Sequence, residues 1–265
     1  MVSFSFRKVI SWEMPTSSTI GANIWLMAVA GDTVYTLWTN SIYAWKEGQE
    51  LPQAVATGLT PDYYSSYDDA KEQVGDQADS LIYRLVSDGT TLYGLNRHTG
   101  KLFPLTFADG KLTEGTPVQL DWQDIEVTPS ADSDNYRDIV RVLISEGKLY
   151  LLVRDYQNYD QPILYSFDLA SGTRQELKVP TMQDLYPYKD GKMLVYLFDS
   201  STAYSDDGTL QKPPVLAVMD PADSSTVTMA TLSDSNCFGF VYQAATDTLY
   251  YTDNNQVMAM RFAAG

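Results

Sequence analysis

Histidine, cysteine and long apolar runs are almost absent from this chain, and each scarcity argues against a class of function. The single histidine, His98, excludes a histidine-rich metal site, and its place in a Thr-Gly turn argues against a Ser-His-Asp relay. The single cysteine, Cys237, excludes an internal disulfide framework. No apolar run approaches the roughly 18 residues that a membrane helix needs, so we expect no direct membrane insertion.

Basic residues are also scarce, since 18 Lys and Arg stand against 34 Asp and Glu, which gives a net charge of -16. This charge repels phosphate backbones and anionic headgroups at long range, so nucleic acid is not an expected partner. It serves either solubility or the attraction of a cationic or polyhydroxylated ligand. No charged and then apolar leader follows Met1, and no signal peptide is therefore predicted.

In place of these features the chain has an internal repeat. Five times, a tight turn containing Gly or Asp precedes an aliphatic strand that in most cases ends in Tyr. These turns contain Gly31, Gly89, Gly147, Gly191 and Asp247. Their spacing of about 44 to 58 residues is that of propeller blades. Alternating apolar strands flank the turns and no window keeps a 3.6-residue period, so an all-β fold with little helix is predicted.

The repeats divide into four short strands each, except for the fifth, which ends before its fourth strand. The fourth strands of the first four repeats are predicted at residues 53–57, 117–120, 174–179 and 226–232. The chain begins with an unpaired strand at residues 6–12, and its pairing with the fifth repeat would remove exposed edges from the ring. We therefore predict a single β-propeller domain over residues 1–265. It has about five four-stranded antiparallel blades, the last of which is closed by the N-terminal strand. A fragment of a longer ring is the alternative.

One turn resembles those of a known group of propellers. Residues 165–172, Tyr-Ser-Phe-Asp-Leu-Ala-Ser-Gly, are similar to the "strand, Asp, two residues, Ser/Thr-Gly" turn of TolB-like and quinoprotein-like bacterial propellers, and residues 96–101 form a looser version. The resemblance covers the turns of two blades and transfers no active site. It implies a bacterial protein related to cell-envelope lipoproteins, and hence an extracytoplasmic location, cell-envelope associated or secreted.

The long connections are predicted to share one rim of the ring. In an antiparallel meander, loops between the second and third strands lie on the same rim as the links between blades, whereas the other turns lie on the opposite rim. The insertions fall in two such links, residues 60–79 and 121–137, and in two such loops, residues 155–162 and 199–214. Binding residues concentrate on long loops of a rigid scaffold, so this rim is the predicted binding face.

Aromatic and acidic residues are frequent in these connections. Aromatic rings beside carboxylates stack on sugars or contact cations, although they also pack on neighbouring loops without any ligand. The aromatic candidates are Tyr63, Tyr64, Tyr67, Trp122, Tyr136, Tyr156, Tyr159 and Tyr204. A second set of candidates directly precedes or begins the inner strands and is predicted to converge at the channel mouth. This set is Asn23, Asp79, Asp138, Asp184 and Asn236.

Three functions remain open for this arrangement. The first is a non-catalytic module of a bacterial cell-envelope protein that binds a small molecule, glycan or protein at the long-loop face, as a monomer and without cofactor or metal. The second is a glycan-active hydrolase that uses Asp79, Asp138 and Asp184, because such enzymes hold carboxylates around one bond. The third is a structural spacer of a larger protein. The first is the prediction that we retain, since Asn and Asp also begin strands to satisfy local backbone groups.

Overall fold

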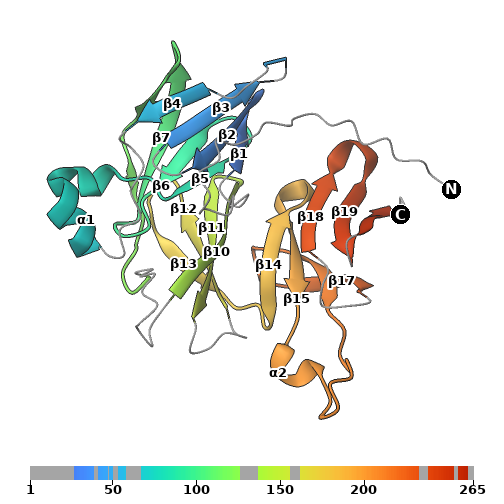
Figure 1. Ribbon diagram of the computed structural model, residues 1–265. Helices are drawn as coiled ribbons and strands as arrows, with labels where there is room; N and C mark the ends of the chain where they lie inside the picture. The colour runs from blue at the N-terminus through green and yellow to red at the C-terminus, as the bar shows by residue number, and fades with distance from the viewer. Residues whose placement is uncertain are drawn as a thin grey trace.

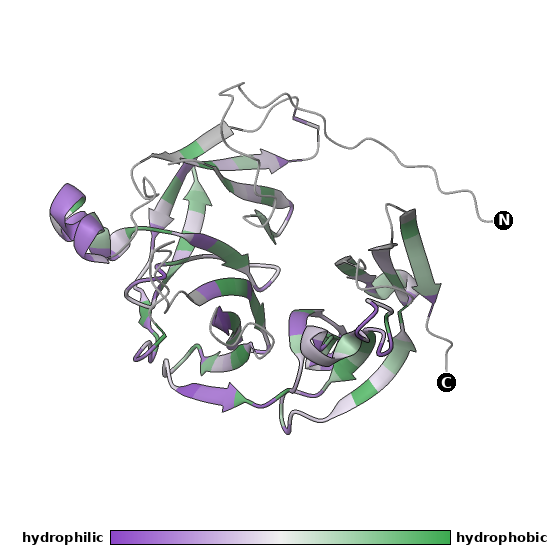
Figure 2. Ribbon diagram, turned by 60° about the horizontal axis from the view of Figure 1, so that its bottom comes forward, coloured by the Kyte–Doolittle hydropathy of each residue, from purple (hydrophilic) through white to green (hydrophobic). Residues whose placement is uncertain are grey.

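The computed structural model describes residues 27–38, 41–46, 48–49, 53–57, 67–125, 137–155, 162–232, 238–253 and 256–261. It is an all-β structure in which five antiparallel sheets stand around an axis as the blades of a β-propeller, as predicted (Figure 1, Figure 2). Consecutive strands pair within each blade, and the first strand of every blade lies innermost.

The strands of the first three blades follow in chain order. Blade 1 contains β1 (Met27–Ala30), β2 (Thr33–Trp38), β3 (Ser41–Lys46) and β4 (Gln53–Thr57); blade 2 contains β5 (Arg84–Ser87), β6 (Leu92–Leu95), β7 (Lys101–Ala108), β8 (Lys111–Glu114) and the short β9 (Val118–Gln119); blade 3 contains β10 (Arg137–Ser145), β11 (Lys148–Asp155), β12 (Ile163–Asp168) and β13 (Arg174–Leu177).

The last two blades complete the described fold. Blade 4 contains β14 (Met182–Pro187), β15 (Met193–Leu197), β16 (Val215–Met219) and β17 (Thr226–Thr231), and blade 5 contains β18 (Phe238–Gln243), β19 (Thr248–Asp253) and β20 (Gln256–Arg261). Blade 5 has three strands among the described residues. The predicted fourth strand at residues 6–12 lies outside the described residues, so closure by that strand stays a prediction.

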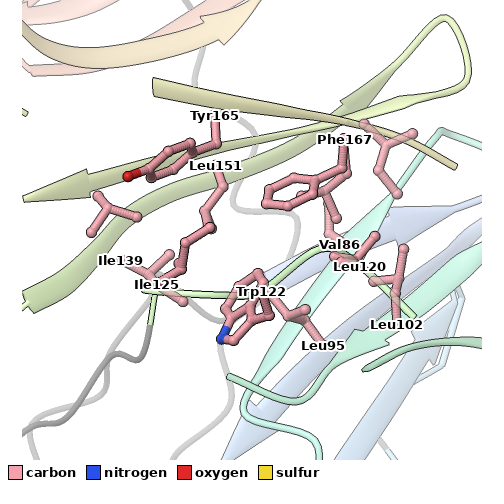
Figure 3. Packing of buried hydrophobic residues seen from close by; sticks show 13 residues of the cluster. Val86, Leu95, Leu102, Leu120, Trp122, Ile125, Ile139, Leu151, Tyr165 and Phe167 are labelled. Atoms are coloured by element: carbon pink, nitrogen blue, oxygen red, sulfur yellow. The ribbon is translucent and has the colours of Figure 1, made fainter. Parts of the chain in front are cut away.

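The core lies between the blades, because the sheets of blades 2, 3 and 4 bury apolar side chains on both faces and those of blades 1 and 5 on one face. Four clusters fill the four seams from blade 1 to blade 5 in turn. Figure 3 shows the cluster between blades 2 and 3, where Leu95 and Trp122 meet Leu151 and Phe167. Each seam buries a continuous apolar layer, and this burial is the main stabilising contribution to the ring.

Glycines at the turns allow the blades to approach closely. Gly172, in the turn between β12 and β13, has a φ of 73° and lies directly against the blade 2 to blade 3 link. A Cβ atom at this position would overlap the carbonyl oxygen of Gln119. The "Ser/Thr-Gly" part of the turn is therefore required by packing between blades as well as by the positive φ.

Blade 2 differs from the sequence prediction in two places. The link at residues 60–79, which was expected to be a loop, contains the helix α1 (Tyr67–Val74) and most of the 3₁₀-helix η2 (Gly75–Ser80). The fourth strand was predicted at residues 117–120, but the fourth strand of the blade is β8 at residues 111–114. Asp109 and Gly110 both have positive φ, as in the two-residue turns of tight β-hairpins, so β8 pairs with β7 directly after this turn. The predicted segment contains β9, which pairs with the start of β7.

Candidate binding rim

Hydrogen bonds and ion pairs join the turns of neighbouring strands and blades. On one side, the β1–β2 and β5–β6 turns are joined by a bond from Gly31 N to Gly89 O of 2.9 Å, and the β14–β15 and β18–β19 turns by an ion pair from Lys189 Nζ to Asp247 Oδ1 of 3.1 Å. The turn after β12 joins the turn after β10 in the same way, through Leu169 N and Gly147 O at 3.0 Å. We call this side the short-turn rim.

The longer connections meet one another on the other side. Asn96 Nδ2, in the β6–β7 turn, donates to Ala78 O of η2 at 2.9 Å. Gln183 Nε2, at the start of β14, donates to Phe198 O of the β15–β16 loop at 2.9 Å, and Arg154 Nη2 at the end of β11 donates to Gln183 Oε1 at 3.1 Å. We call this side the long-loop rim. Of the four predicted long connections, the link that ends in η2 and the β15–β16 loop are the ones described on it.

Tyr67 and Asp79 form one unit on the long-loop rim. The Tyr67 hydroxyl, at the start of α1, donates to Asp79 Oδ1 at 2.6 Å, and Lys101 Nζ lies 3.5 Å from Asp79 Oδ2. The hydrogen bond from Tyr67 is the main cause that lowers the pKa of Asp79, and the same bond raises the pKa of Tyr67. Both groups are therefore fixed in their ordinary charge states, and the pair fastens α1 to η2.

Asp184 is fully occupied by a buried ion pair between blades 3 and 4. Arg141 Nε donates to Asp184 Oδ1 at 2.9 Å and Arg141 Nη2 to Oδ2 at 2.7 Å, while the Tyr186 hydroxyl donates to Oδ2 at 2.6 Å. The Leu185 amide donates to Oδ1 at 2.8 Å. The side chains of Arg141 and Asp184 are only 25% and 17% exposed. Four donors use the acceptor positions of the carboxylate, so Asp184 tethers two blades.

Asp138 lies in β10, directly opposite Arg154 of β11, and is partly exposed. It belongs to the blade next to that of Asp184, but the guanidinium that binds Asp184 comes from Arg141, three residues further along β10. The three predicted acids thus lie on neighbouring blades, and each has a different setting. The structure shows no shared proton or hydrogen bond between any two of them among the described residues.

Trp122 is a core residue, contrary to its assignment to the binding face. Its side chain is 8% exposed, its ring stacks on Phe167 at a centroid distance of 5.8 Å, and its Nε1 donates to Arg97 O at 2.8 Å (Figure 3). The link bends inward here, and the indole fills the seam between blades 2 and 3. A tryptophan in a polar connection gave no local sign of this burial, so sequence reasoning placed it on the surface.

Tyr204 is the candidate aromatic residue that the structure presents to solvent, with 45% of the residue exposed. It follows the short helix α2 (Ser200–Ala203), whose N-cap Asp199 accepts from Ser201 N at 3.1 Å. Asp207 accepts from Ser205 Oγ at 2.6 Å and from Thr209 N at 3.0 Å, and these bonds lower the pKa of Asp207 to about 2. Two ionised carboxylates therefore brace the loop with Tyr204, which follows α2 in the chain (α2 is labelled in Figure 1).

The remaining candidates lie outside the described residues. They are Asn23, Tyr63, Tyr64, Tyr136, Tyr156, Tyr159 and Asn236. Their place on the rim stays a prediction. Within the described ranges, no three His, Cys, Asp or Glu residues are grouped as a metal site would require, and no helix is long and apolar enough to cross a bilayer.

Sequence reasoning missed the buried polar turn between β6 and β7. Asn96, Arg97 and His98 are all buried there, and the Arg97 guanidinium lies 4.5 Å from the centre of the Tyr83 ring. Burial, with a smaller contribution from the charge of Arg97, lowers the pKa of His98 to about 4. His98 is therefore uncharged at neutral pH and packs edge-on against Tyr83. The Asn-x-x-Thr-Gly order indicated a turn but not its burial.

Comparisons with known proteins find only distant structural neighbours. No protein-family model matches the chain, and no curated protein matches it. The extracellular domain of the putative one component system BT4673 from B. thetaiotaomicron aligns with a TM-score of 0.48 and 12% identity, over 95% of this chain and 29% of that one. A chain of the nidogen/laminin complex aligns with a TM-score of 0.49 and 15% identity, over 89% of this chain and 75% of that one.

The Dos1 propeller aligns with a TM-score of 0.45 and 13% identity, over 86% of this chain and 52% of that one. The chain thus spans less than a third of the BT4673 domain and about half of the Dos1 propeller. The TolB-like assignment stays a prediction, because none of these comparisons bears on it.

Proposed function

We propose that this propeller is a non-catalytic binding module of an extracytoplasmic bacterial protein, and that it holds its ligand or partner on the long-loop rim. The observation on which the proposal depends is the exposed Tyr204 on a hydrogen-bonded, acidic loop of that rim. An aromatic ring fixed in advance loses little conformational entropy on binding, and adjacent carboxylates favour cationic or hydroxyl-rich ligands.

The unit formed by Tyr67 and Asp79 supports the same rim. The first turn of α1 contains Asp68 and Asp69, and the partly exposed Tyr67 is held in place by its bond to Asp79. Ordered aromatic and acidic groups thus occur on two different blades of one rim. The location in the cell envelope is proposed from the resemblance of residues 165–172 to the turns of envelope propellers.

The state of Asp184 argues against the hydrolase alternative. A general acid or nucleophile needs a carboxylate oxygen free to reach the substrate, whereas both oxygens of Asp184 accept hydrogen bonds from Arg141 and from a second donor. Asp184 therefore fits a structural role better than a catalytic one.

A thermal-shift screen with glycans and polyamines, followed by calorimetric titration of each hit, tests the proposal. We expect at least one compound to raise the melting temperature, and Tyr204→Ala to weaken its binding roughly tenfold, as for the loss of an aromatic anchor. Tyr43→Ala, in β3 of blade 1, is the matched control and leaves the affinity unchanged.

Two results would contradict the proposal. Cleavage of a glycoside panel that is lost in Asp138→Asn would favour the hydrolase. The spacer would be favoured if no compound gave a thermal shift and if, in pull-down experiments, Tyr204→Ala captured the same proteins as the natural sequence.

A further inference from the structure

A cavity of about 330 Å³ lies between blades 1 and 2 at the short-turn rim, across the ring from the proposed binding rim. Six of the residues that line it are Asp32, Thr33, Tyr35, Lys46, Thr91 and Phe107. They come from both blades, on β2, β3 and β7 and the turns between β1 and β2 and between β5 and β6. A volume of this size lies at the lower end of the range for small-molecule sites.

The mouth of the cavity is fixed by polar contacts. The bond from Gly31 N to Gly89 O, 2.9 Å long, sets the spacing of the two turns that flank it. Lys46 Nζ lies 2.9 Å and 3.2 Å from the two oxygens of Asp32, and Thr33 Oγ1 donates to Asp32 Oδ1 at 3.0 Å. The charges of Lys46 and Asp32 cancel, so the polar wall is neutral within a strongly acidic protein.

The inner wall combines apolar surface with one polar group, the Tyr35 hydroxyl, which has no hydrogen-bond partner among the described residues. Leu92 and Leu105 are buried beneath the cavity, and the rings of Tyr35 and Phe107 meet edge to face at a centroid distance of 6.2 Å. Tyr35 is 5% exposed. No group in the described part of the chain forms a hydrogen bond with the Tyr35 hydroxyl. A phenol that is nearly buried and lines a cavity ordinarily has a partner there, so this hydroxyl is available to a ligand.

We propose that this cavity binds a neutral, hydroxyl-rich ligand of the size of a monosaccharide or disaccharide. The ammonium group of Lys46, the carboxylate of Asp32 and the threonine hydroxyls offer donors and acceptors to sugar hydroxyls, while the partly exposed Phe107 ring offers a wall to the C–H face of a pyranose. An ionic ligand of either sign would have to break the pair of Lys46 with Asp32. The site is independent of the long-loop rim and of the function proposed for it.

The test is a titration of the full chain with a panel of methyl pyranosides and disaccharides, followed by NMR of the threonine methyl and tyrosine signals. We expect the signals of Thr33, Thr91 and Tyr35 to shift for at least one sugar. Tyr35→Phe removes only the hydroxyl and keeps the ring contact with Phe107. It is expected to weaken binding about fivefold, and Lys46→Met roughly tenfold or more, in line with one neutral and one charged hydrogen bond.

Controls separate this site from the long-loop rim and from loss of folding. Tyr204→Ala should leave the sugar affinity unchanged, and Tyr35→Phe should leave the melting temperature unchanged because no described hydrogen bond is lost. If none of the sugars shifts the signals of the cavity residues, the proposal is wrong. It is equally wrong if a sugar binds but shifts the signals around Tyr204, or if Tyr35→Phe and Lys46→Met bind it as tightly as the natural sequence.

Discussion

The ion pair of Arg141 with Asp184 offers the sharpest test of how the blades are held together. In Arg141→Met the unbranched side chain keeps most of the buried stem, but the carboxylate of Asp184 remains in a setting where its side chain is only 17% exposed. It keeps the hydroxyl of Tyr186 and the amide of Leu185 as donors and loses both guanidinium donors. The variant thus isolates the cost of a partly buried carboxylate without its cation.

Breaking a buried pair by removal of one partner costs about 3–5 kcal/mol. Because both side chains retain some contact with water, we expect about 3 kcal/mol, at the lower end of this range. For a chain of this size each kcal/mol lowers the melting temperature by roughly 2–4 °C, so the variant should melt roughly 6–12 °C below the natural sequence. Urea denaturation should show a lower midpoint with an unchanged m-value.

The control is a pair that the structure leaves in solvent. Lys192 Nζ lies 3.9 Å from Asp220 Oδ2, with both side chains well exposed, so Lys192→Met should change the unfolding free energy by less than about 1 kcal/mol. The double variant Arg141→Met/Asp184→Leu removes both charges and should recover much of the lost stability. If Arg141→Met behaves like Lys192→Met, or if the double variant is no better than the single one, this account of the seam is refuted.

Two further predictions concern single residues. The pKa of His98 is about 4 in the folded state and 6.5 in the unfolded chain, so between these pH values the unfolded chain binds more protons. The contribution of His98 to the unfolding free energy is therefore fully present above pH 6.5 and is lost as the pH falls toward 4. Calorimetry at a series of pH values should show that His98→Gln loses this part of the slope. Gly172→Ala should destabilise more than Gly147→Ala in urea denaturation, because both have positive φ but only Gly172 faces a backbone oxygen. The Gly147 variant should cost about 1 kcal/mol, and equal costs would contradict the packing argument.

The architecture was accessible from the sequence because it depends on local signals that repeat. Each tight turn places a Gly or Asp where the backbone needs positive φ, as at Gly147 and Asp247, and each is followed by an alternating strand. The meander then decides which connections share a rim, since strand direction alternates. Blade number, strand order and the two rims follow from these elements without knowledge of any tertiary contact.

The site was less accessible because side-chain partners come from distant residues. The sequence placed Asp184 correctly at the start of an inner strand, but its partner Arg141 lies on the preceding blade, 43 positions earlier in the chain. In the same way, the burial of Trp122 depends on Phe167 of the next blade. Local pattern indicates that a residue is polar or aromatic. Whether that residue faces solvent or another blade depends on contacts between blades.

The seam between blades 5 and 1 differs from the other four in a way that bears on ring closure. Ala28 of β1 is buried against blade 2, but its neighbours Met27 and Val29, which point the other way, are 51% and 54% exposed. Val241, on the inner strand β18 of blade 5, is 62% exposed. Apolar side chains on inner strands are buried at the other seams, so the exposure on both sides of this one indicates that a further segment is needed to seal it.

Chain order indicates which segment this is. Between blades the chain passes from an outer strand to the inner strand of the next blade, as in the described link from β13 to β14. By this order, a strand upstream of β1 belongs to the outer edge of the preceding blade. In a five-membered ring that edge is β20, which has no second neighbour among the described strands. Residues 6–12 precede β1 in the sequence, and the strand predicted there would place Phe6, Ile10 and Trp12 on one face.

Val9→Pro tests this closure, because proline removes the amide donor and disrupts pairing in the middle of a strand. In the natural sequence the amides of β20 that point away from β19 should be protected from hydrogen exchange, and in Val9→Pro they should exchange roughly tenfold faster or more. Thr16→Pro, in the predicted link before β1, should leave this protection intact. Protection that is unaffected by Val9→Pro but rises with protein concentration would instead assign the edge of β20 to a second copy of the chain. If the β20 amides are unprotected from the outset, the seam is open and the ring requires blades from outside these residues.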